Sequence, residues 1–426
     1  MAIGNQAIAV PKRVATTFDT LSLSLDFPNE DQALWWKDTA PLLERLLSAT
    51  GYDVHLQYLH LIFHYRYVLA ALGPYPKAKS DSIVPGGCPY ELSVNFQQGK
   101  TVVRFDFAPT TAIGQTGRSH DQYCPWPTVN KLLAELSNDG REIDTRLYNH
   151  FINALAVTKK DLSALQKCPT MHLSTQSILS WDLKSCFNDL KMYFFPLVKA
   201  DAVRAPSGQL VLNAVRGADG GRFISPAFNL VETSLGEMGL LSNVCILGWD
   251  CVPDEGRVKI YLAEPNVTKA NVHHLWTLGG RLNSSTINKG WELLSRLWDY
   301  LGIPEGVRST TELGQPEQED GRSGLTFSYE LRPGSLEPEP KIYIPLVGEN
   351  DMAVVRSLAQ FTSDLGWTDL DSYPSKLANV FSHVDMNIST RLITSLSFAY
   401  TEEKGPYMSA YYFSSGRYPW EGSRLL

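Results

Sequence analysis

Lysine and tyrosine recur two residues apart in three segments that lie far from one another in the chain. The triplets are KMY at Lys191, KIY at Lys259 and KIY at Lys341. In a β-strand, residues two apart lie on the same face, about 6.6 to 6.8 Å from each other, so each triplet would place a cation beside an aromatic ring. A group of buried cations needs an anion of high charge. A diphosphate fits, because its oxygens accept hydrogen bonds from ammonium and guanidinium groups.

Two arginines share this alternation. Arg104 lies between two apolar residues and shares its strand face with Asp106, and Arg257 precedes Lys259 by two residues. On an open sheet, such a charged face would simply be the face toward solvent. Inside a barrel, the same residues would converge. The converging set is Arg104, Lys191, Arg257, Lys259 and Lys341 with Tyr193, Tyr261, Tyr343, Tyr407 and Tyr411.

Tyrosine rings beside a diphosphate site suggest a particular reaction. Each ring face attracts a cation by about 0.5 to 2 kcal/mol where water is excluded. This suits the ionisation of an allylic diphosphate, which leaves a carbocation that must be shielded from water. Many enzymes that ionise such donors hold magnesium with a D-D-x-x-D motif, and this chain has none. The fixed Lys and Arg charges are therefore predicted to replace the metal, so that no metal or other cofactor is required.

The strands that carry these residues are expected to alternate with helices. Helix caps and apolar periodicity predict helices over residues 30–51 and 56–72, and alternation predicts a strand pair over 89–97 and 101–109. Four more strand pairs follow, which implies about ten mostly antiparallel strands. The predicted fold class is α/β: a ten-stranded antiparallel barrel surrounded by helices, built from repeated ααββ units. The remaining pairs are 177–184 with 189–196, 245–251 with 257–264, 325–333 with 340–348 and 392–402 with 406–413, and the remaining helices are 127–137, 145–157, 161–167, 271–280, 288–302, 351–366 and 373–384.

The length of 426 residues would by itself suggest about three domains. No Pro/Gly/Ser-rich linker divides the repeated units, so a single domain over residues 1–426 is expected. A loosely ordered leader is expected at about 1–29 and a tail at about 414–426.

Charge and composition exclude several classes of protein. The chain has 38 Lys and Arg against 45 Asp and Glu, a net charge of -7, which argues against a nucleic-acid partner. No segment reaches the roughly 20 apolar residues that span a bilayer, and the N-terminus lacks the apolar core of a secretory signal, so a cytoplasmic protein is expected. The six cysteines form no C-x-x-C pair, and His60 and His64 have no acidic partner in an H-E-x-x-H motif, so no metal site is predicted.

Several motifs in order resemble the fungal dimethylallyl tryptophan synthase family of aromatic prenyltransferases over nearly the whole chain. They include WWKDTAPLLERLL, PYELSVN, VVRFDFAP, DLKMYFFP, RVKIYLAE, PEPKIYIPLVGEND and SFAYTEEKGPYMSAYYF. The resemblance implies the barrel called the ABBA fold, in which dimethylallyl diphosphate meets an aromatic acceptor, and a role in fungal indole alkaloid biosynthesis, a branch of secondary metabolism. It implies that the five cations hold the diphosphate and that the five tyrosines shield the carbocation. It also implies that Glu91 is catalytic, accepting a hydrogen bond from the indole N–H and taking a proton; from strand alternation alone, Glu91 would be a solvated charge.

Departures from the family narrow the acceptor. Members that prenylate carbon 4 of free tryptophan carry a lysine where this chain has Ile178, and free-tryptophan members carry an arginine where it has Val244. Without these groups, the carboxylate of free tryptophan would lack a partner. Lys341 and the ending EKGPYMSAYYF resemble members that act on tryptophan-containing cyclic dipeptides. The predicted reaction is therefore metal-independent transfer of a dimethylallyl group to the indole of such a dipeptide or a related indole alkaloid precursor.

Other functions remain open at this point. Within the same class, the acceptor is alternatively free tryptophan, tyrosine or another aromatic such as a phenolic polyketide. From a different class, a non-catalytic barrel would carry an anionic, prenyl-like ligand. The sequence does not specify the ring position, regular or reverse attachment, the stereochemistry or the oligomeric state, and a homodimer is among the assemblies that it allows.

Overall fold

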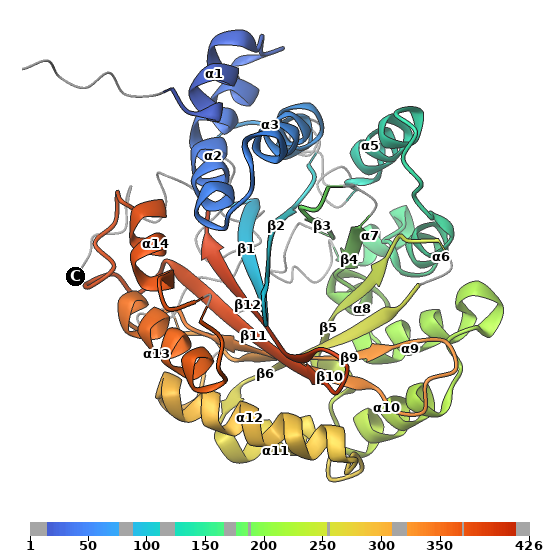
Figure 1. The fold of residues 1–426 in the computed structure, drawn as a ribbon. Coiled ribbons are helices and arrows are strands. Elements are labelled where there is room, and N and C mark those ends of the chain that lie inside the picture. The colour runs from blue at the N-terminus through green and yellow to red at the C-terminus, as the bar shows by residue number, and fades with distance from the viewer. Residues whose placement is uncertain are drawn as a thin grey trace, which may run out of the picture.

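Ten strands close into a barrel in which every neighbouring pair is antiparallel (Figure 1). The structure, a computed structural model, describes residues 15–75, 88–110, 124–165, 176–185, 189–253, 256–308, 322–368 and 370–414. Around the barrel, the order is β1, β12, β11, β10, β9, β6, β5, β4, β3 and β2, and β2 pairs with β1. The predicted ten-stranded barrel is confirmed. The strands are β1 (Tyr90–Gln97), β2 (Lys100–Phe107), β3 (Ser177–Asp182), β4 (Leu190–Phe194), β5 (Val244–Asp250), β6 (Val258–Glu264), β9 (Leu325–Leu331), β10 (Glu339–Pro345), β11 (Ile393–Thr401) and β12 (Gly405–Phe413).

Each of the five predicted strand pairs is a pair of neighbours in the barrel. Because all neighbours are antiparallel, the alternate strands β2, β4, β6, β10 and β12 run in one direction. Because of this shared direction, equivalent positions of these five strands come in the same order along the lumen. A separate small sheet pairs β7 (Asn266–Val267) with β8 (Gly306–Val307).

Helices surround the barrel in Figure 1, with α1 to α3 above the first strands, α11 and α12 below, and α13 and α14 beside the last strands. The helix predicted over residues 56–72 is helical throughout, but its middle part, His64–Val68, is a π-helix between the α-helical segments α3 and α4. The helices are α1 (Thr17–Ser24), α2 (Glu30–Ala49), α3 (Val54–Phe63), α4 (Leu69–Leu72), α5 (Trp126–Asn138), α6 (Arg146–Leu155), α7 (Lys159–Leu165), α8 (Leu197–Val203), α9 (Ser207–Gly217), α10 (Pro226–Glu237), α11 (Lys269–Trp276), α12 (Ser285–Leu301), α13 (Asp351–Asp364) and α14 (Tyr373–Val380), with 3-10 turns at Ala218–Gly221 and Leu241–Asn243.

The structure corrects two expectations about helices. Helix α1 lies inside the expected leader and begins with a capping box, in which Thr16 accepts from the backbone of Asp19 and the Asp19 side chain accepts from the backbone of Thr16. Helices α8, α9 and α10 lie between β4 and β5, where no helix was predicted. Helix α10 has a recognisable start, because Ser225 caps it and Pro226 occupies its first turn. Residues 1–14, 166–167 and 415–426 lie outside the described residues.

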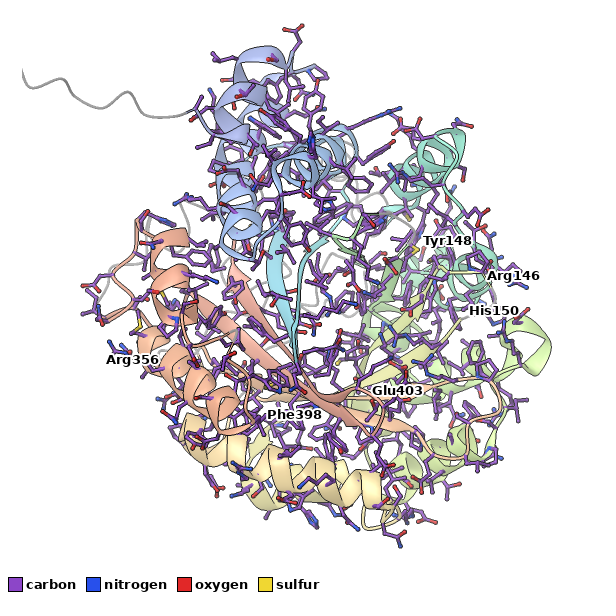
Figure 2. The ribbon with its side chains drawn as sticks, in the orientation of Figure 1. Arg146, Tyr148, His150, Arg356, Phe398 and Glu403 are labelled. Atoms are coloured by element: carbon purple, nitrogen blue, oxygen red, sulfur yellow. The ribbon has the colours of Figure 1, made fainter. Side chains whose placement is uncertain are left out.

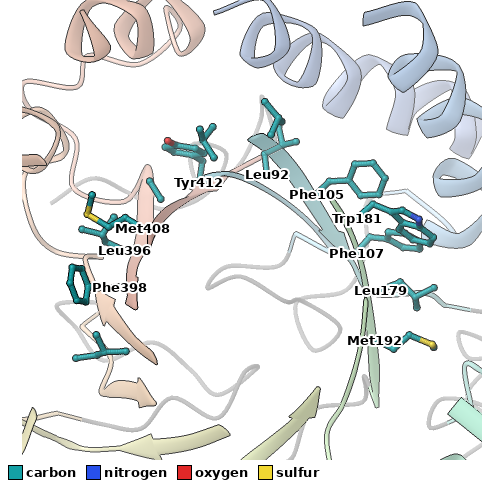
Figure 3. Close-up of a cluster of buried hydrophobic side chains, with 14 of the residues drawn as sticks. Leu92, Phe105, Phe107, Leu179, Trp181, Met192, Leu396, Phe398, Met408 and Tyr412 are labelled. Atoms are coloured by element: carbon teal, nitrogen blue, oxygen red, sulfur yellow. The ribbon is translucent and has the colours of Figure 1, made fainter. Parts of the chain in front are cut away.

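The hydrophobic core lies between the barrel and the helices. Figure 3 shows Phe105, Phe107 and Trp181 on the outer face of the strands, directed away from the lumen, and all three are fully buried. Side chains fill the layer between barrel and helices around the whole ring (Figure 2). Because alternate residues of a strand face opposite ways, this apolar outer face leaves the intervening polar residues for the lumen. In the described part of the chain, no helix has the length and apolar character needed to cross a bilayer.

Candidate active site

The predicted cations form one layer of the lumen. The strands β2, β4, β6 and β10 run in the same direction. In each of them, a Lys or Arg that faces the lumen is followed two residues later by another residue that faces the lumen. Arg104 precedes Asp106, and each lysine of the three triplets precedes its tyrosine. Arg104 and the three lysines therefore lie one step further along the lumen than Asp106 and those tyrosines, and Arg257 lies one step beyond Lys259. The structure thus brings together Arg104, Lys191, Arg257, Lys259 and Lys341.

Three carboxylates, which the sequence had not singled out, lie among these cations. Asp182 pairs with Arg104, whose Nε lies 2.6 Å from its Oδ1, and also with Lys191. Although burial acts in the opposite direction, these two cations hold the pKa of Asp182 below its ordinary value.

The other two carboxylates, Glu330 and Asp250, pair with the cations at the start of β6. Glu330 lies 2.9 Å from Nη1 of Arg257 and 3.8 Å from Nζ of Lys259. Asp250 contacts the same two cations. Four of the five cations therefore have carboxylate partners within the protein. For three of them, strand pairing places an acid directly opposite: Arg104 opposite Asp182, Lys191 opposite Asp250 and Lys259 opposite Glu330.

Lys341 differs from the other four cations. Its Nζ lies 5.0 Å from the ring centroids of both Tyr343 and Tyr407, and it forms no ion pair with a carboxylate of the described chain. Burial first, and then the positive charge of Arg104, lower the pKa of Lys341 well below its usual value. Burial, followed by Arg257, lowers the pKa of Lys259 to about 8. An anion bound nearby would therefore stabilise the charged forms of both lysines.

Four of the five predicted tyrosines form an arc of neighbouring rings. The ring centroids of Tyr193 and Tyr261 are 6.0 Å apart, those of Tyr261 and Tyr343 are 5.7 Å apart, and those of Tyr343 and Tyr411 are 6.0 Å apart. The fifth, Tyr407, lies in the cation layer, where its hydroxyl accepts from Arg104 and the guanidinium carbon lies 5.5 Å from its ring centroid. The tyrosine layer thus directly adjoins the cations.

A cavity of about 450 Å³ opens on the other side of the tyrosine layer. Its volume lies within the range of about 300 to 1,000 Å³ that is usual for small-molecule sites. The four tyrosines of the arc form part of its wall, together with the carboxyl groups of Glu91 and Asp106. Of the described residues that line it, none is a lysine, an arginine or a histidine. The cavity is therefore aromatic, apolar and acidic, whereas the layer beneath it is cationic.

Glu91 lies on β1 and lines this cavity. The hydroxyl of Thr394 donates to its Oε1 at 3.1 Å, and burial followed by the charge of Asp106 raises its pKa well above the ordinary value. Sequence alternation did not identify Thr394, because a β-bulge in β11 between Ile393 and Ser395 allows both Thr394 and Ser395 to line the cavity.

Ile178 and Val244, the two positions used to limit the choice of acceptor, lie in different surroundings. Ile178 lines the cavity. Val244 pairs with the outward-facing Leu262 and packs toward Gly208 of α9, where its Cγ2 lies 2.9 Å from the point that a Cβ on that glycine would occupy. Val244 is therefore not among the residues that line the cavity, and the structure does not support the argument that this position selects the acceptor.

Known proteins resemble this chain in sequence and in structure. The family model described as tryptophan dimethylallyltransferase matches residues 31–376. Prenyltransferase malE of Malbranchea aurantiaca is 36% identical over 411 residues, covering 95% of this chain and 92% of the relative. Echinulin prenyltransferase 1 of Aspergillus ruber is 36% identical over 426 residues, covering 98% and 100%. The crystal structure of NotF in complex with brevianamide F and DMSPP is 33% identical, with a TM-score of 0.84 over 94% of this chain and 99% of that chain.

Proposed function

The chain belongs to the tryptophan dimethylallyltransferase family, and we propose that this aromatic prenyltransferase joins a dimethylallyl group to the indole of a tryptophan-containing cyclic dipeptide. The observation that carries the acceptor assignment is the charge of the cavity wall, which has two carboxyl groups and, among its described residues, no basic side chain. Free tryptophan would bring its own carboxylate into this wall without a cationic partner, which is costly. A cyclic dipeptide has no free carboxylate and presents only amides.

A solved relative supports an interior that holds two ligands. The NotF structure contains brevianamide F and DMSPP, and its fold matches 94% of this chain. In the present barrel, two sites of opposite character adjoin each other: a cationic layer suited to a diphosphate, and an acidic, aromatic cavity suited to a neutral indole.

The donor's diphosphate is assigned to the cation layer. Five cations stand there against three carboxylates, so positive charge is in excess where the anion would bind. The C–O bond of the donor breaks with its electron pair remaining on the diphosphate oxygen, and positive side chains stabilise the charge that develops there. The allyl cation left behind faces the rings of the tyrosine arc, which attract it and exclude water.

The acceptor's reaction is assigned to the cavity side of this arc. An indole carbon attacks the allyl cation and forms the new C–C bond. Glu91 accepts a hydrogen bond from the indole N–H and takes the proton that the alkylated ring loses. Aromaticity is thereby restored, and the proton leaves to water with the product.

Transfer is proposed to need no metal, because the side chains named above supply the positive charge that magnesium supplies elsewhere. Within the described residues, no three His, Cys, Asp or Glu side chains are grouped so as to hold a metal ion. The proposal rests on the cations that are present, and its direct test is activity in a chelator.

The test is turnover of dimethylallyl diphosphate in excess EDTA, with products identified by mass. The acceptor panel contains cyclic tryptophan dipeptides, free tryptophan, tyrosine and a phenolic polyketide. We expect a gain of one prenyl unit, with the highest kcat/KM for a cyclic dipeptide. Product with magnesium but none with EDTA would refute metal independence, and donor binding without turnover on any acceptor would favour the carrier alternative.

A charge placed in the wall provides a sharper test of the acceptor assignment. Ile178→Lys puts a cation into the cavity, and Ile178→Met is the uncharged control of comparable size. Relative to the control, the lysine variant should raise the kcat/KM for free tryptophan and lower that for the cyclic dipeptide. Equal effects of both substitutions on both acceptors would show that the charge of the wall does not select the acceptor.

A further inference from the structure

Asp106 is a second carboxyl group in the acceptor cavity, and neither the sequence motifs nor the reaction described above gives it a role. It lies on β2 directly opposite Glu91 of β1, and both side chains line the cavity. Residues directly opposite in an antiparallel pair have Cβ atoms about 4.5 to 5.5 Å apart. Its Oδ1 is buried and has no hydrogen-bond partner within the described structure. The two carboxyl groups therefore lie on one wall of the same cavity, and the charge of Asp106 acts on the ionisation of Glu91.

The surroundings of the two carboxyl groups are unequal. Burial, with a smaller contribution from the charge of Asp182, raises the pKa of Asp106, while the Ser180 hydroxyl and the positive charges of Arg104 and Lys191 oppose this shift. Glu91 has only the hydrogen bond from Thr394 to set against burial and the charge of Asp106. Asp106 is therefore the member that ionises first. The titratable groups that interact with one or both members are Tyr90 of β1, Arg104 of β2, Asp182 of β3, Lys191 and Tyr193 of β4, Tyr343 of β10 and Tyr411 of β12.

We propose that Asp106 is a positioning residue for the proton transfer: its negative charge makes Glu91 a stronger base, able to take the proton that the prenylated indole loses. A lone carboxylate is a weak proton acceptor near neutral pH, and a general base works best when its own proton affinity is matched to the working pH. Asp106 is thus the member of the pair that ionises at lower pH, and its charge raises the pH at which Glu91 ionises. The proposal rests on the proposed function, in which Glu91 is the base.

The first test is the pH dependence of kcat/KM with a cyclic tryptophan dipeptide. Activity requires ionised Glu91, so the wild-type rate should fall on the acid side with a midpoint above the range of an ordinary glutamate. In Asp106→Asn, which removes the charge and keeps the shape, the midpoint should move down by about one to two pH units. Asp106→Glu keeps the charge and should keep the midpoint near that of the wild type.

The two pH profiles should also differ in height. At high pH, Asp106→Asn should be the slower enzyme, because its base is weaker, whereas below the wild-type midpoint it loses less of its activity. A uniform fall in rate at every pH, with the midpoint unchanged, would show that Asp106 matters only for structure and would overturn the proposal. If Asp106→Asn does not fold, Asp106→Ser removes the same charge and carries the same expectation.

A second measurement does not depend on turnover. The infrared band of a protonated carboxyl group, followed against pH in the enzyme without substrate, reports Glu91 directly when Glu91→Gln is used to identify the band. This band should titrate at lower pH in Asp106→Asn than in the wild type, and an identical titration would refute the coupling. If no acceptor is turned over but the band shifts, the proposed function fails while the coupling of the two carboxyl groups stands.

Discussion

Gly248 of β5 lies between two rings of the tyrosine arc, and its replacement by alanine tests how closely those rings must approach. Its backbone pairs with Tyr193 of β4 on one side and with Lys259 of β6 on the other. A Cβ at Gly248 would lie 3.0 and 3.1 Å from two ring carbons of Tyr193 and 3.3 Å from a ring carbon of Tyr261. Carbon atoms in contact normally lie about 3.5 to 4.0 Å apart. In Gly248→Ala, both rings must therefore move away by a few tenths of an ångström.

Two effects of this displacement can be given magnitudes. Overpacking of a filled interior costs about 1 to 3 kcal/mol. The unfolding entropy of a chain of 426 residues is about 0.9 kcal/mol/K, so the Tm should fall by about 1 to 3 °C. Loss of one cation–π contact, about 0.5 to 2 kcal/mol, would shift the competition between indole and water for the allyl cation by about 2- to 30-fold.

The assay measures two products of the same donor. Prenylated acceptor and dimethylallyl alcohol are quantified together, and their ratio should fall in Gly248→Ala; thermal unfolding is measured alongside. Gly236→Ala is the matched control, because Gly236 lies in α10 and a Cβ there has no other atom within 4 Å. The control should keep the product ratio and gain up to about 1 kcal/mol of stability. A wild-type product ratio in Gly248→Ala would refute the shielding role of this ring pair.

Three further predictions concern the donor site. Donor affinity, measured by calorimetry without acceptor, should fall as the pH rises through about 8, because Lys259 loses its proton there; a flat profile from pH 7 to pH 10 would exclude a charged Lys259 from binding. Lys341→Met should weaken donor binding by about tenfold or more and leave the Tm nearly unchanged, since no carboxylate is left without a partner; a large fall in Tm with unchanged affinity would contradict this. Glu330→Gln should instead lower the Tm by about 3 to 6 °C, because Arg257 loses a buried partner worth about 3 to 5 kcal/mol, and an unchanged Tm would show that Asp250 alone compensates the charge.

The strands and the cation layer were predictable because their signals are local. Alternation over seven or eight residues decides which face of β6 carries Lys259 and Tyr261, whatever lies beside that strand. The helices α8 to α10 were missed, although Ser225 and Pro226 gave a usable start signal for α10. The capping box at Thr16 and Asp19 would likewise have placed α1.

The carboxylate partners could not be read in the same way. That Asp182 faces Arg104, and Glu330 faces Lys259, depends on which strands are neighbours and on their register, and neither is visible within one segment. Where a strand contains a bulge, the alternation of side chains between its two faces breaks down. In β5, a register shift between Val244 and Ile246 lets the adjacent Cys245 and Ile246 both line the cavity. Glu91 was identified by resemblance alone, because an isolated glutamate on a strand is most often solvated.

The arrangement of charge along the lumen bears on the direction in which the carbocation moves. In the proposed reaction, ionisation would leave the allyl cation between a diphosphate held by the cation layer and an acceptor cavity that contains Glu91 and the more readily ionised Asp106. In a donor site of bare cations, the new cation would be drawn only toward its own diphosphate, and recombination would compete with transfer. Asp182, Asp250 and Glu330 reduce the net charge of the donor layer, while the carboxylate of Asp106 attracts the cation from the acceptor side. The tyrosine arc lies between these two regions, so the cation can move toward the indole without leaving the aromatic surface that protects it from water.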